Sequence, residues 1–247
     1  MAQQHRRPVW QGERKVGAMC STACLDFGRA QLVSDDVSGK DILEVGSVNV
    51  NGSMRDVIEP LDPGSYMGVD IAAGPGVDQV CDIADLASRF GPESFDVVVC
   101  TEVFEHVRDW RGATHNLKEV LRPGGVLLLT TRSKGFPYHG YPHDFWRYEQ
   151  YDIEVIFSDM TIESSEPDPS RPGVFVKARR PKGFVERRFE DYALHSVVTR
   201  KRCVDIGDLS LAVFKAKRAL WKRLPVRIKR RIPDGLRARI REHGVMK

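Results

Sequence analysis

Three acidic residues in the first third of the sequence each stand where a short apolar run ends. Glu44 comes two residues before Gly46, Asp70 ends the run SYMGVD, and Asp82 ends the run VDQVCD. Because ligands of open α/β sheets bind where the carboxyl ends of parallel strands meet, we expect these carboxylates to lie together. Glycine at the first turn lets the backbone approach such a ligand closely. The set suits a ligand with a cationic part, a ribose and a base that donates hydrogen bonds.

The turn after Glu44 differs from the turn that binds dinucleotides. In G-x-G-x-x-G the glycines and a helix N-terminus cradle a pyrophosphate, whereas Val48 occupies the second glycine position here. A carboxylate at the strand end would repel a pyrophosphate and attract an ammonium group. Gly46 alone could simply close a loop, and Asp70 alone could simply cap one. The recurrence of acids at successive run ends indicates a ligand other than NAD.

Histidines that could act as bases lie in two segments. His106 ends the segment EVFEH, and His139 and His143 lie in FPYHGYPHDFWRY. Imidazole is the commonest general base in enzymes, so we expect His106 and His139 to act on a substrate. Other side chains of the second segment would bind that substrate, namely Tyr138, His143, Asp144 and Arg147.

Both segments also have plainer interpretations. His106 could orient its own loop or cap a helix. The segment PHDFWR could be a packing motif, with Trp146 in the core and Arg147 paired with an acid. The sequence leaves these alternatives open.

The runs that carry these residues indicate alternating strands and helices. FDVVVC and VLLLT are almost continuously apolar, as expected of strands covered by helices on both faces. The predicted strands are Asp41–Val45, Ser65–Asp70, Val77–Cys81, Phe95–Thr101 and Gly125–Thr131. The predicted helices are Cys20–Leu32, Met54–Glu59, Ala84–Phe90 and Ala113–Leu121, the last ended by the stop signal RPGG. This order predicts a doubly wound α/β sheet with short right-handed crossovers.

Two further strands close the series. A predicted helix over Tyr148–Phe157 is followed by apolar runs at Met160–Glu166 and Gly173–Arg179, with a proline-rich turn between them. A parallel crossover needs about a dozen residues or more, so these strands must be antiparallel neighbours. We therefore predict a mostly parallel sheet of seven strands with an antiparallel hairpin at its edge.

The basic charge of the chain is concentrated at its end. Residues 215–247 hold 13 of the 38 Lys and Arg and 2 of the 34 Asp and Glu, so this segment carries +11 and the rest −7. Helical spacing predicts a basic amphipathic helix whose apolar face holds Leu209, Val213, Ala216, Leu220 and Leu224, widened by Phe214 and Trp221. Such a helix could dock on the domain or a partner subunit, lie on an anionic membrane surface, or, less readily, contact nucleic acid.

Composition bounds the remaining possibilities. A chain of 247 residues with 41% hydrophobic and 29% charged residues predicts one main globular domain. No apolar run reaches about 20 residues and the N-terminus lacks a signal-peptide core, so we expect a cytoplasmic protein or one peripheral to the inner face of the membrane. The five cysteines form no disulfide framework, and Cys20 and Cys24 lack the further ligands of a metal centre. No metal site is predicted.

Taken in order, these segments resemble the class I S-adenosylmethionine-dependent methyltransferases of the type 11 group. The resemblance is carried by ILEVG, GVD, CD, FDVVVCTEVFEH and LRPGGVLLLT. It implies a Rossmann-like methyltransferase domain. We expect this domain at residues 40–182, after an arm and helix at 1–39 and before a connector at 183–208 and the basic helical tail at 209–247.

The resemblance implies S-adenosylmethionine as the cofactor. The residues that it places around the cofactor, from the methionine part to the ribose, the adenine and the opposite wall, are Glu44, Gly46, Ser47, Asp70, Ile71, Asp82, Ile83, Thr101 and Glu102. The chain departs from the family in its first loop, where Val48 and Val50 stand near positions that are often glycine.

The sequence narrows the methyl acceptor by exclusion. Amino-methyltransferases acting on nucleic-acid bases carry Asn or Asp before Pro-Pro and an aromatic residue after the fourth strand, where this chain reads TEVF. No Pro-Cys pair for cytosine methylation is present. We expect a small-molecule, sugar or lipid-linked glycan acceptor. The alternatives are a weakly active, methyltransferase-like binding or regulatory module, and an RNA methyltransferase that uses the basic tail.

Overall fold

The computed structural model of the protein describes residues 21–49, 52–140, 142–225, 227–228 and 233. The predicted arm, Cys20, Val50 and all of the basic residues beyond 228 lie outside these ranges.

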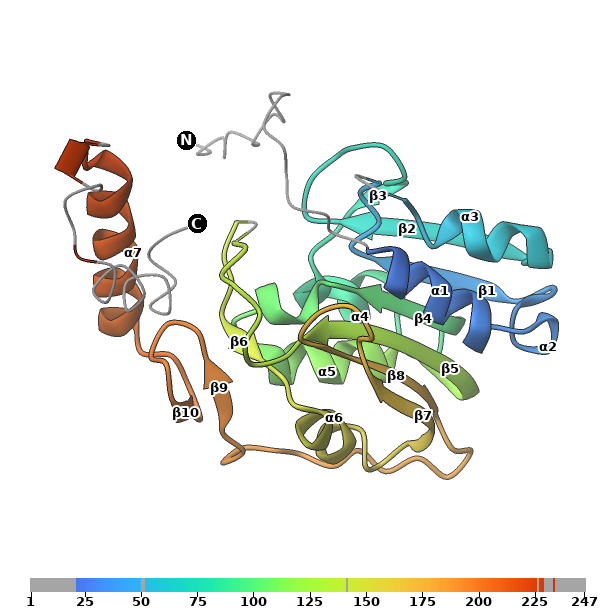
Figure 1. Ribbon diagram of the computed structural model, residues 1–247. Coiled ribbons are helices and arrows are strands. Elements are labelled where there is room, and N and C mark those ends of the chain that lie inside the picture. The colour runs from blue at the N-terminus through green and yellow to red at the C-terminus, as the bar shows by residue number, and fades with distance from the viewer. Residues whose placement is uncertain (1–20, 50–51, 141, 226, 229–232, 234–247) are drawn as a thin grey trace, which may run out of the picture.

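A seven-stranded sheet runs through the middle of the molecule (Figure 1). Its strands are β1 (Asp41–Val45), β2 (Ser65–Asp70), β3 (Gln79–Val80), β4 (Phe95–Thr101), β5 (Leu121–Arg132), β7 (Thr161–Pro167) and β8 (Gly173–Arg179). They lie in the order β3-β2-β1-β4-β5-β8-β7. β8 pairs antiparallel with both β5 and β7, and the other pairings are parallel. The predicted doubly wound sheet with an antiparallel hairpin is confirmed, and the strand that runs against the others is β8.

Helices cover both faces of this sheet. On one face lie α1 (Thr22–Gln31), α2 (Ser34–Val37) and α3 (Arg55–Ile58), and on the other lie α4 (Leu86–Phe90), α5 (Trp110–Glu119) and α6 (Gln150–Ile156). Because side chains alternate along a strand, Val98 of β4 packs on the α4–α6 side and Val99 on the α1–α3 side. The nearly continuous apolar run of this strand follows from its two buried faces.

Several boundaries differ from the prediction for local reasons. Helix α5 begins at Trp110 instead of Ala113, because the Asp109 side chain accepts a hydrogen bond from the Gly112 backbone N–H and caps the helix. Strand β5 begins at Leu121, which pairs with Phe95 before the register shifts. The RPGG segment is therefore a bulged part of the strand and not a turn before it. Strand β3 is two residues long where five were predicted.

A second, smaller sheet was not predicted. It has the order β10-β9-β6 and consists of β6 (Trp146–Arg147), β9 (Leu194–Ser196) and β10 (Arg202–Cys203). Two of these strands lie in the segment expected to be a connector. Arg111 of α5 fastens this segment, donating to the carbonyl oxygens of Phe189 at 2.7 Å and Tyr192 at 2.8 Å. Strands this short leave no periodic pattern in a sequence.

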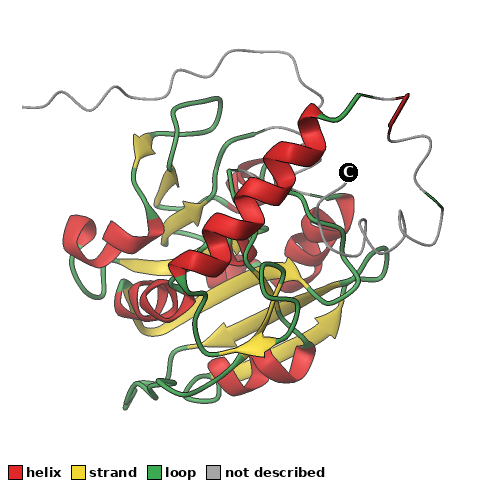
Figure 2. Ribbon diagram, turned by 90° about the vertical axis from the view of Figure 1, so that its left-hand side faces the viewer, coloured by secondary structure: helices red, strands yellow, loops and turns green. Residues whose placement is uncertain are grey.

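Helix α7 (Asp208–Arg223) crosses in front of the sheet when the molecule is viewed from its side (Figure 2). Phe214 and Trp221 are buried, and the Phe214 ring lies 5.6 Å from that of Tyr138. Leu209 and Leu220 are 79% and 65% exposed. The helix therefore docks through residues that were expected only to widen its apolar face, and the predicted face points outward. Among the described residues, no helix has the length and apolar character needed to span a membrane.

Candidate active site

A cavity of about 260 Å³ opens at the carboxyl ends of β1, β2 and β4. Predicted site residues form much of its wall, namely Gly46, Asp70, Ile71, Asp82, Ile83, Glu102, His106 and His143. The wall also contains Arg108, which the sequence reasoning missed, together with Val45, Cys81, Val103, Val107 and Pro142. The structure thus brings together residues that are far apart along the chain, from Val45 to His143.

Gly46 forms a part of this wall that no other residue could form. Its φ angle is +83°, which side chains rarely adopt. A β-carbon at this position would lie 2.1 Å from Cγ2 of Val103. The Gly46 N–H donates to the Val69 carbonyl at 2.9 Å, which fixes the turn against β2. The conformation and the close approach both require glycine.

Asp70 offers hydrogen-bond acceptors at the end of β2. Its carboxylate is 6% exposed and accepts backbone N–H groups from Val48 at 3.4 Å and Ala72 at 3.2 Å. Burial raises the pKa of Asp70. Further lone pairs remain for a ligand, because a carboxylate can accept about four hydrogen bonds.

The neighbouring part of the wall is apolar with one further acid. Ile71 is 47% exposed although it is large and apolar, and it lines the cavity with Ile83. Asp82 accepts the Ala84 N–H at 3.0 Å through Oδ1. Two isoleucines and an acid suit a flat base with an exocyclic amino group. The residues present therefore fit the ribose and adenine of S-adenosylmethionine.

Glu44, Ser47 and Thr101 do not line the cavity. The Glu44 carboxylate is 3% exposed, and its two oxygens accept the Met54 N–H at 3.3 Å and the Tyr66 hydroxyl at 2.8 Å. Because side chains alternate along β1, Glu44 points to the face opposite Val45. The sequence-based placement of Glu44 against the cofactor's methionine part needs this correction. Gly46, from the same turn, does line the cavity.

Glu102 lies deeper in the wall than expected. It has a φ angle of +58° and is 2% exposed. Its carboxylate forms an ion pair with Arg132 and accepts the Thr130 hydroxyl at 3.1 Å. The pairing leaves less capacity for a ligand than the sequence suggested.

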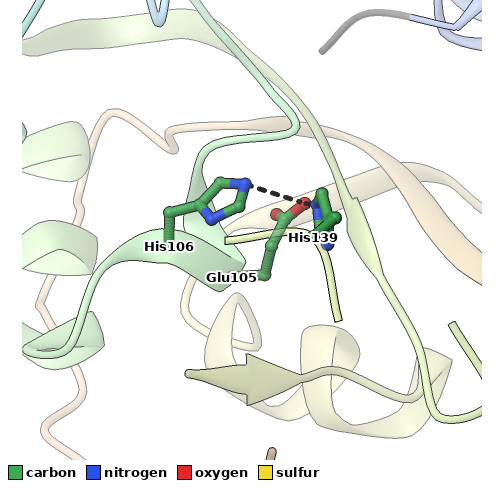
Figure 3. A group of neighbouring side chains, drawn as sticks. All are labelled: Glu105, His106 and His139. Atoms are coloured by element: carbon green, nitrogen blue, oxygen red, sulfur yellow. Dashed lines mark hydrogen bonds and ion pairs between the residues drawn. The ribbon is translucent and has the colours of Figure 1, made fainter. Parts of the chain in front are cut away.

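Beside the cavity, two histidines turn their rings toward one carboxylate (Figure 3). Glu105 Oε1 lies 3.2 Å from His139 Nε2 and 3.9 Å from His106 Nε2. The ring centroids of His106 and His139 are 4.6 Å apart. Glu105 is fully buried, whereas the side chains of His106 and His139 are 10% and 23% exposed. Sequence reasoning missed Glu105, although a glutamate directly before a candidate histidine was a signal.

His139 is bonded on both ring nitrogens. Its Nδ1 lies 3.1 Å from Asp144 Oδ2, and its Nε2 faces Glu105. Burial favours the neutral ring, but hydrogen bonds to the two carboxylates outweigh it and raise the pKa of His139 to about 9. Carboxylates thus face both ring nitrogens of His139, and its role as a base stays a prediction.

Asp144 and Arg147 hold the loop through paired contacts with each other. Arg147 Nη2 lies 2.8 Å from Asp144 Oδ2, and Arg147 Nη1 lies 2.5 Å from Oδ1. Arg147 also donates to the carbonyl oxygen of Pro137 at 3.2 Å, and Trp146 is 1% exposed in the core. Of the two interpretations of this segment, the packing motif holds for Trp146 and Arg147.

A second cavity of about 240 Å³ lies between this loop and α7. Tyr138, Asp144 and His143 line it from the loop, and Phe214, Lys215 and Arg218 line it from the helix. The Arg218 guanidinium stacks 3.5 Å from the Tyr138 ring centroid. Pro142 and His143 border both cavities. Two adjoining cavities could hold a donor and an acceptor side by side.

The strand order and the acids at the carboxyl edge define the class I methyltransferase fold. The sequence profile described as "methyltransferase domain" matches residues 22–164, more than half of the chain. The protein belongs to this methyltransferase family.

Curated relatives match part of the chain. The ubiquinone biosynthesis O-methyltransferase of Idiomarina loihiensis is 27% identical over 114 residues, which cover 41% of this chain and 46% of the relative. The match thus spans about half the length of that relative.

Solved structures share the fold at low identity. The 1,6-didemethyltoxoflavin-N1-methyltransferase of Burkholderia thailandensis has a TM-score of 0.52 and 15% identity, over 64% of this chain and 79% of its own. The [4+2]-cyclase SpnF has a TM-score of 0.52 and 14% identity, over 64% and 80%. Because a cyclase shares the fold, the fold alone does not determine the reaction.

Proposed function

We propose that this protein transfers the methyl group of S-adenosylmethionine to a hydroxyl group of a small molecule. The observation that carries the proposal is the cavity at the sheet edge, where Asp70 and Asp82 stand beside an exposed isoleucine and adjoin a second cavity. The acceptor atom is proposed from the relatives, which are named O-methyltransferases.

We propose that the residues lining the first cavity bind different parts of the cofactor. Asp70 accepts hydrogen bonds from the ribose hydroxyls, and Ile71 and Ile83 pack on the adenine, whose amino group faces Asp82. The backbone at Gly46 allows the methionine part to approach β1. The bound cofactor supplies an activated methyl group. The protein's contribution is to hold that group in line with the acceptor oxygen.

The acceptor is proposed to occupy the second cavity, with His143 at its border to the first. Lys215 and Arg218 on α7 make this cavity cationic, since Asp144 is neutralised by Arg147. An acceptor with a carboxylate or phosphate fits this charge, which includes an acidic sugar or a lipid-linked phosphate. His106 is the histidine that we place at the acceptor, because it lines the first cavity and His139 does not.

The basic tail is proposed to rest on an anionic membrane surface. Leu209, Val213 and Leu220 are exposed along one side of α7, and basic residues crowd the segment from 215 onward. An amphipathic helix with this composition binds at lipid interfaces. Such contact would suit an acceptor carried on a lipid.

Cofactor binding is the first test of the proposed activity. Calorimetric titration with S-adenosylmethionine and S-adenosylhomocysteine should give micromolar affinity for both. Asp70→Asn should weaken it roughly 10- to 100-fold, because a hydrogen bond to a charged group contributes about 1.5–3 kcal/mol. Asp191→Asn, which alters an exposed aspartate, is the control and should bind both ligands like the wild type.

The outcomes separate the alternatives. Absence of heat with either ligand would contradict an active enzyme. Tight binding with no turnover of any hydroxyl acceptor would instead favour a binding or regulatory module. Salt-dependent methylation of RNA would replace the small-molecule acceptor.

A further inference from the structure

We propose that Glu105, His106 and His139 bind a divalent metal ion at the edge of the cofactor cavity. One ligand atom from each of these residues lies within 4.8 Å of the other two. The cluster contains two imidazoles and one carboxylate, a common ligand set for first-row metals. His106, which the proposed function places at the acceptor, lines the cofactor cavity, and the catalytic use of the metal site rests on that function.

The spacing of the three ligand atoms is close to that of a metal site. Metal bonds of about 2.0–2.2 Å put neighbouring ligands roughly 3–3.5 Å apart. Glu105 Oε1 already lies 3.2 Å from His139 Nε2, and its 3.9 Å distance to His106 Nε2 needs only a small contraction. In Figure 3 both rings point toward the same carboxylate. At 3.9 Å, His106 Nε2 is within ion-pair distance of Glu105 Oε1 but beyond hydrogen-bond distance, and a cation between the two atoms could bind both.

The opposite side of each ring is anchored as in metal-binding histidines. Such histidines donate their other N–H to a carbonyl or carboxylate, which fixes the tautomer and aims the ligating nitrogen. His106 Nδ1 donates to the His143 carbonyl at 2.5 Å. His139 Nδ1 faces Asp144 Oδ2 at 3.1 Å, and Arg147 holds Asp144 in turn. Both Nε2 atoms are thereby directed at Glu105.

The carboxylate is anchored as well. Glu105 Oε2 accepts the Thr131 hydroxyl at 2.9 Å, which leaves Oε1 toward the histidines. The Phe145 N–H donates to the Glu105 carbonyl at 2.9 Å and ties the histidine loop to this turn. The three ligands, Glu105 and His106 from one turn and His139 from the loop after β5, are thus held in place by hydrogen bonds before any metal binds. Two nitrogens and one oxygen suit Zn²⁺, Mn²⁺ or Fe²⁺ better than Mg²⁺ or Ca²⁺, which prefer oxygen ligands.

A metal ion here would activate the acceptor. With three protein ligands, coordination positions remain open for the acceptor hydroxyl and water. Coordination lowers the pKa of the hydroxyl, and its proton leaves to solvent. The oxygen then forms a bond to the methyl carbon while the carbon–sulfur bond breaks, and its electron pair stays on the sulfur of S-adenosylhomocysteine. No oxidant or reductant is needed.

Metal binding can be measured without any methyl transfer. The full chain, dialysed against EDTA, is titrated with Zn²⁺, Mn²⁺ and Co²⁺ by calorimetry, and Co²⁺ binding is also followed by its visible absorption. We expect one ion per chain and a Co²⁺ spectrum with nitrogen ligands. His106→Gln, His139→Ala and Glu105→Gln should each weaken binding at least 100-fold. His115→Ala is the matched control, because this histidine is half exposed and pairs with Glu186 on another face.

Each outcome supports or overturns the site. Wild-type protein that binds S-adenosylhomocysteine and no metal overturns the metal site and leaves the proposed function standing. Binding that survives both His106→Gln and His139→Ala places the ion elsewhere and overturns the assignment. Metal binding without cofactor binding supports the site and counts against the proposed function. Circular dichroism of each variant checks that it folds, and His106→Gln is the decisive variant because its side chain borders the cavity.

Discussion

Glu44 is a buried carboxylate that forms no ion pair with a cationic side chain of the described residues. Its hydrogen bonds come from the Tyr66 hydroxyl and the Met54 N–H, whereas the nearby Arg55 pairs with Asp78. Burial outweighs these bonds and raises the pKa of Glu44 to about 7. We therefore expect Glu44, which resembles a cofactor ligand in the sequence, to act as a pH-dependent element of the core.

The raised pKa predicts how stability changes with pH. Between about pH 4.5 and 7 the folded chain holds the Glu44 proton more tightly than the unfolded chain does. The contribution of Glu44 to the free energy of unfolding should therefore fall across this window, by roughly 3 kcal/mol, and stay level above it. Glu44→Gln removes the titration, and its amide can still bond Met54 and Tyr66.

Urea unfolding at a series of pH values checks this prediction. The difference between wild type and Glu44→Gln should grow from pH 4.5 to 7, with the variant more stable at the higher pH. Glu190→Gln, which alters an exposed glutamate, should follow the wild type. Parallel curves for wild type and Glu44→Gln would show that burial of Glu44 has no such effect.

At the scale of elements, the second cavity depends on α7 lying against the loop after β5. Phe214 is 7% exposed and contacts the Tyr138 ring, while Arg218 stacks on the same ring. Leu209 lies on the outer side of the helix and is 79% exposed. Phe214 is thus one of the two buried aromatic side chains through which α7 docks.

Phe214→Ala should loosen α7 and leave the sheet intact. Removing the ring should cost roughly 2 kcal/mol of docking free energy, about a thirtyfold increase in local opening. Hydrogen exchange should therefore speed up at the amides of 208–223 and stay unchanged in β4. Leu209→Ala should leave both segments unchanged. Uniform acceleration throughout the chain would mean that Phe214 supports the whole fold and not the helix alone.

At the scale of the whole molecule, charge and apolar surface are segregated. The segment from 215 onward carries +11 and the remainder −7, while the sheet separates two buried clusters. The exposed leucines of α7 adjoin the basic end. This arrangement underlies the proposed contact with anionic lipid.

Vesicle sedimentation tests that contact. The protein should pellet with phosphatidylglycerol-containing vesicles and not with pure phosphatidylcholine vesicles. Leu209→Ser with Leu220→Ser should weaken binding roughly tenfold or more, because buried apolar area drives interfacial binding. Val185→Ser, at a site 82% exposed elsewhere, should have no effect. Equal, negligible pelleting of all forms would contradict the membrane proposal, and dimers that dissociate in the double variant would point to a partner subunit.

The sequence by itself determined the strands of the large sheet and several residues that line the cofactor cavity. Strands such as Phe95–Thr101 are long apolar runs, and Gly46, Asp70 and Asp82 lie at run ends that parallel topology must bring to one edge. The apolar runs are local features of the sequence, and the meeting of their ends at one edge follows from the parallel direction of the strands.

Only the tertiary structure decided what the side chains face. Glu44 turns from the cavity because of its place in the alternation of β1, and two carboxylates 39 residues apart, Glu105 and Asp144, meet the same His139 ring. The short strand β6 exists only because it pairs with the distant β9, and β10 then pairs with β9 as the second strand of a hairpin. Contacts between residues far apart along the chain have no periodic pattern, so they follow from how loops cross in space and not from any one run of sequence.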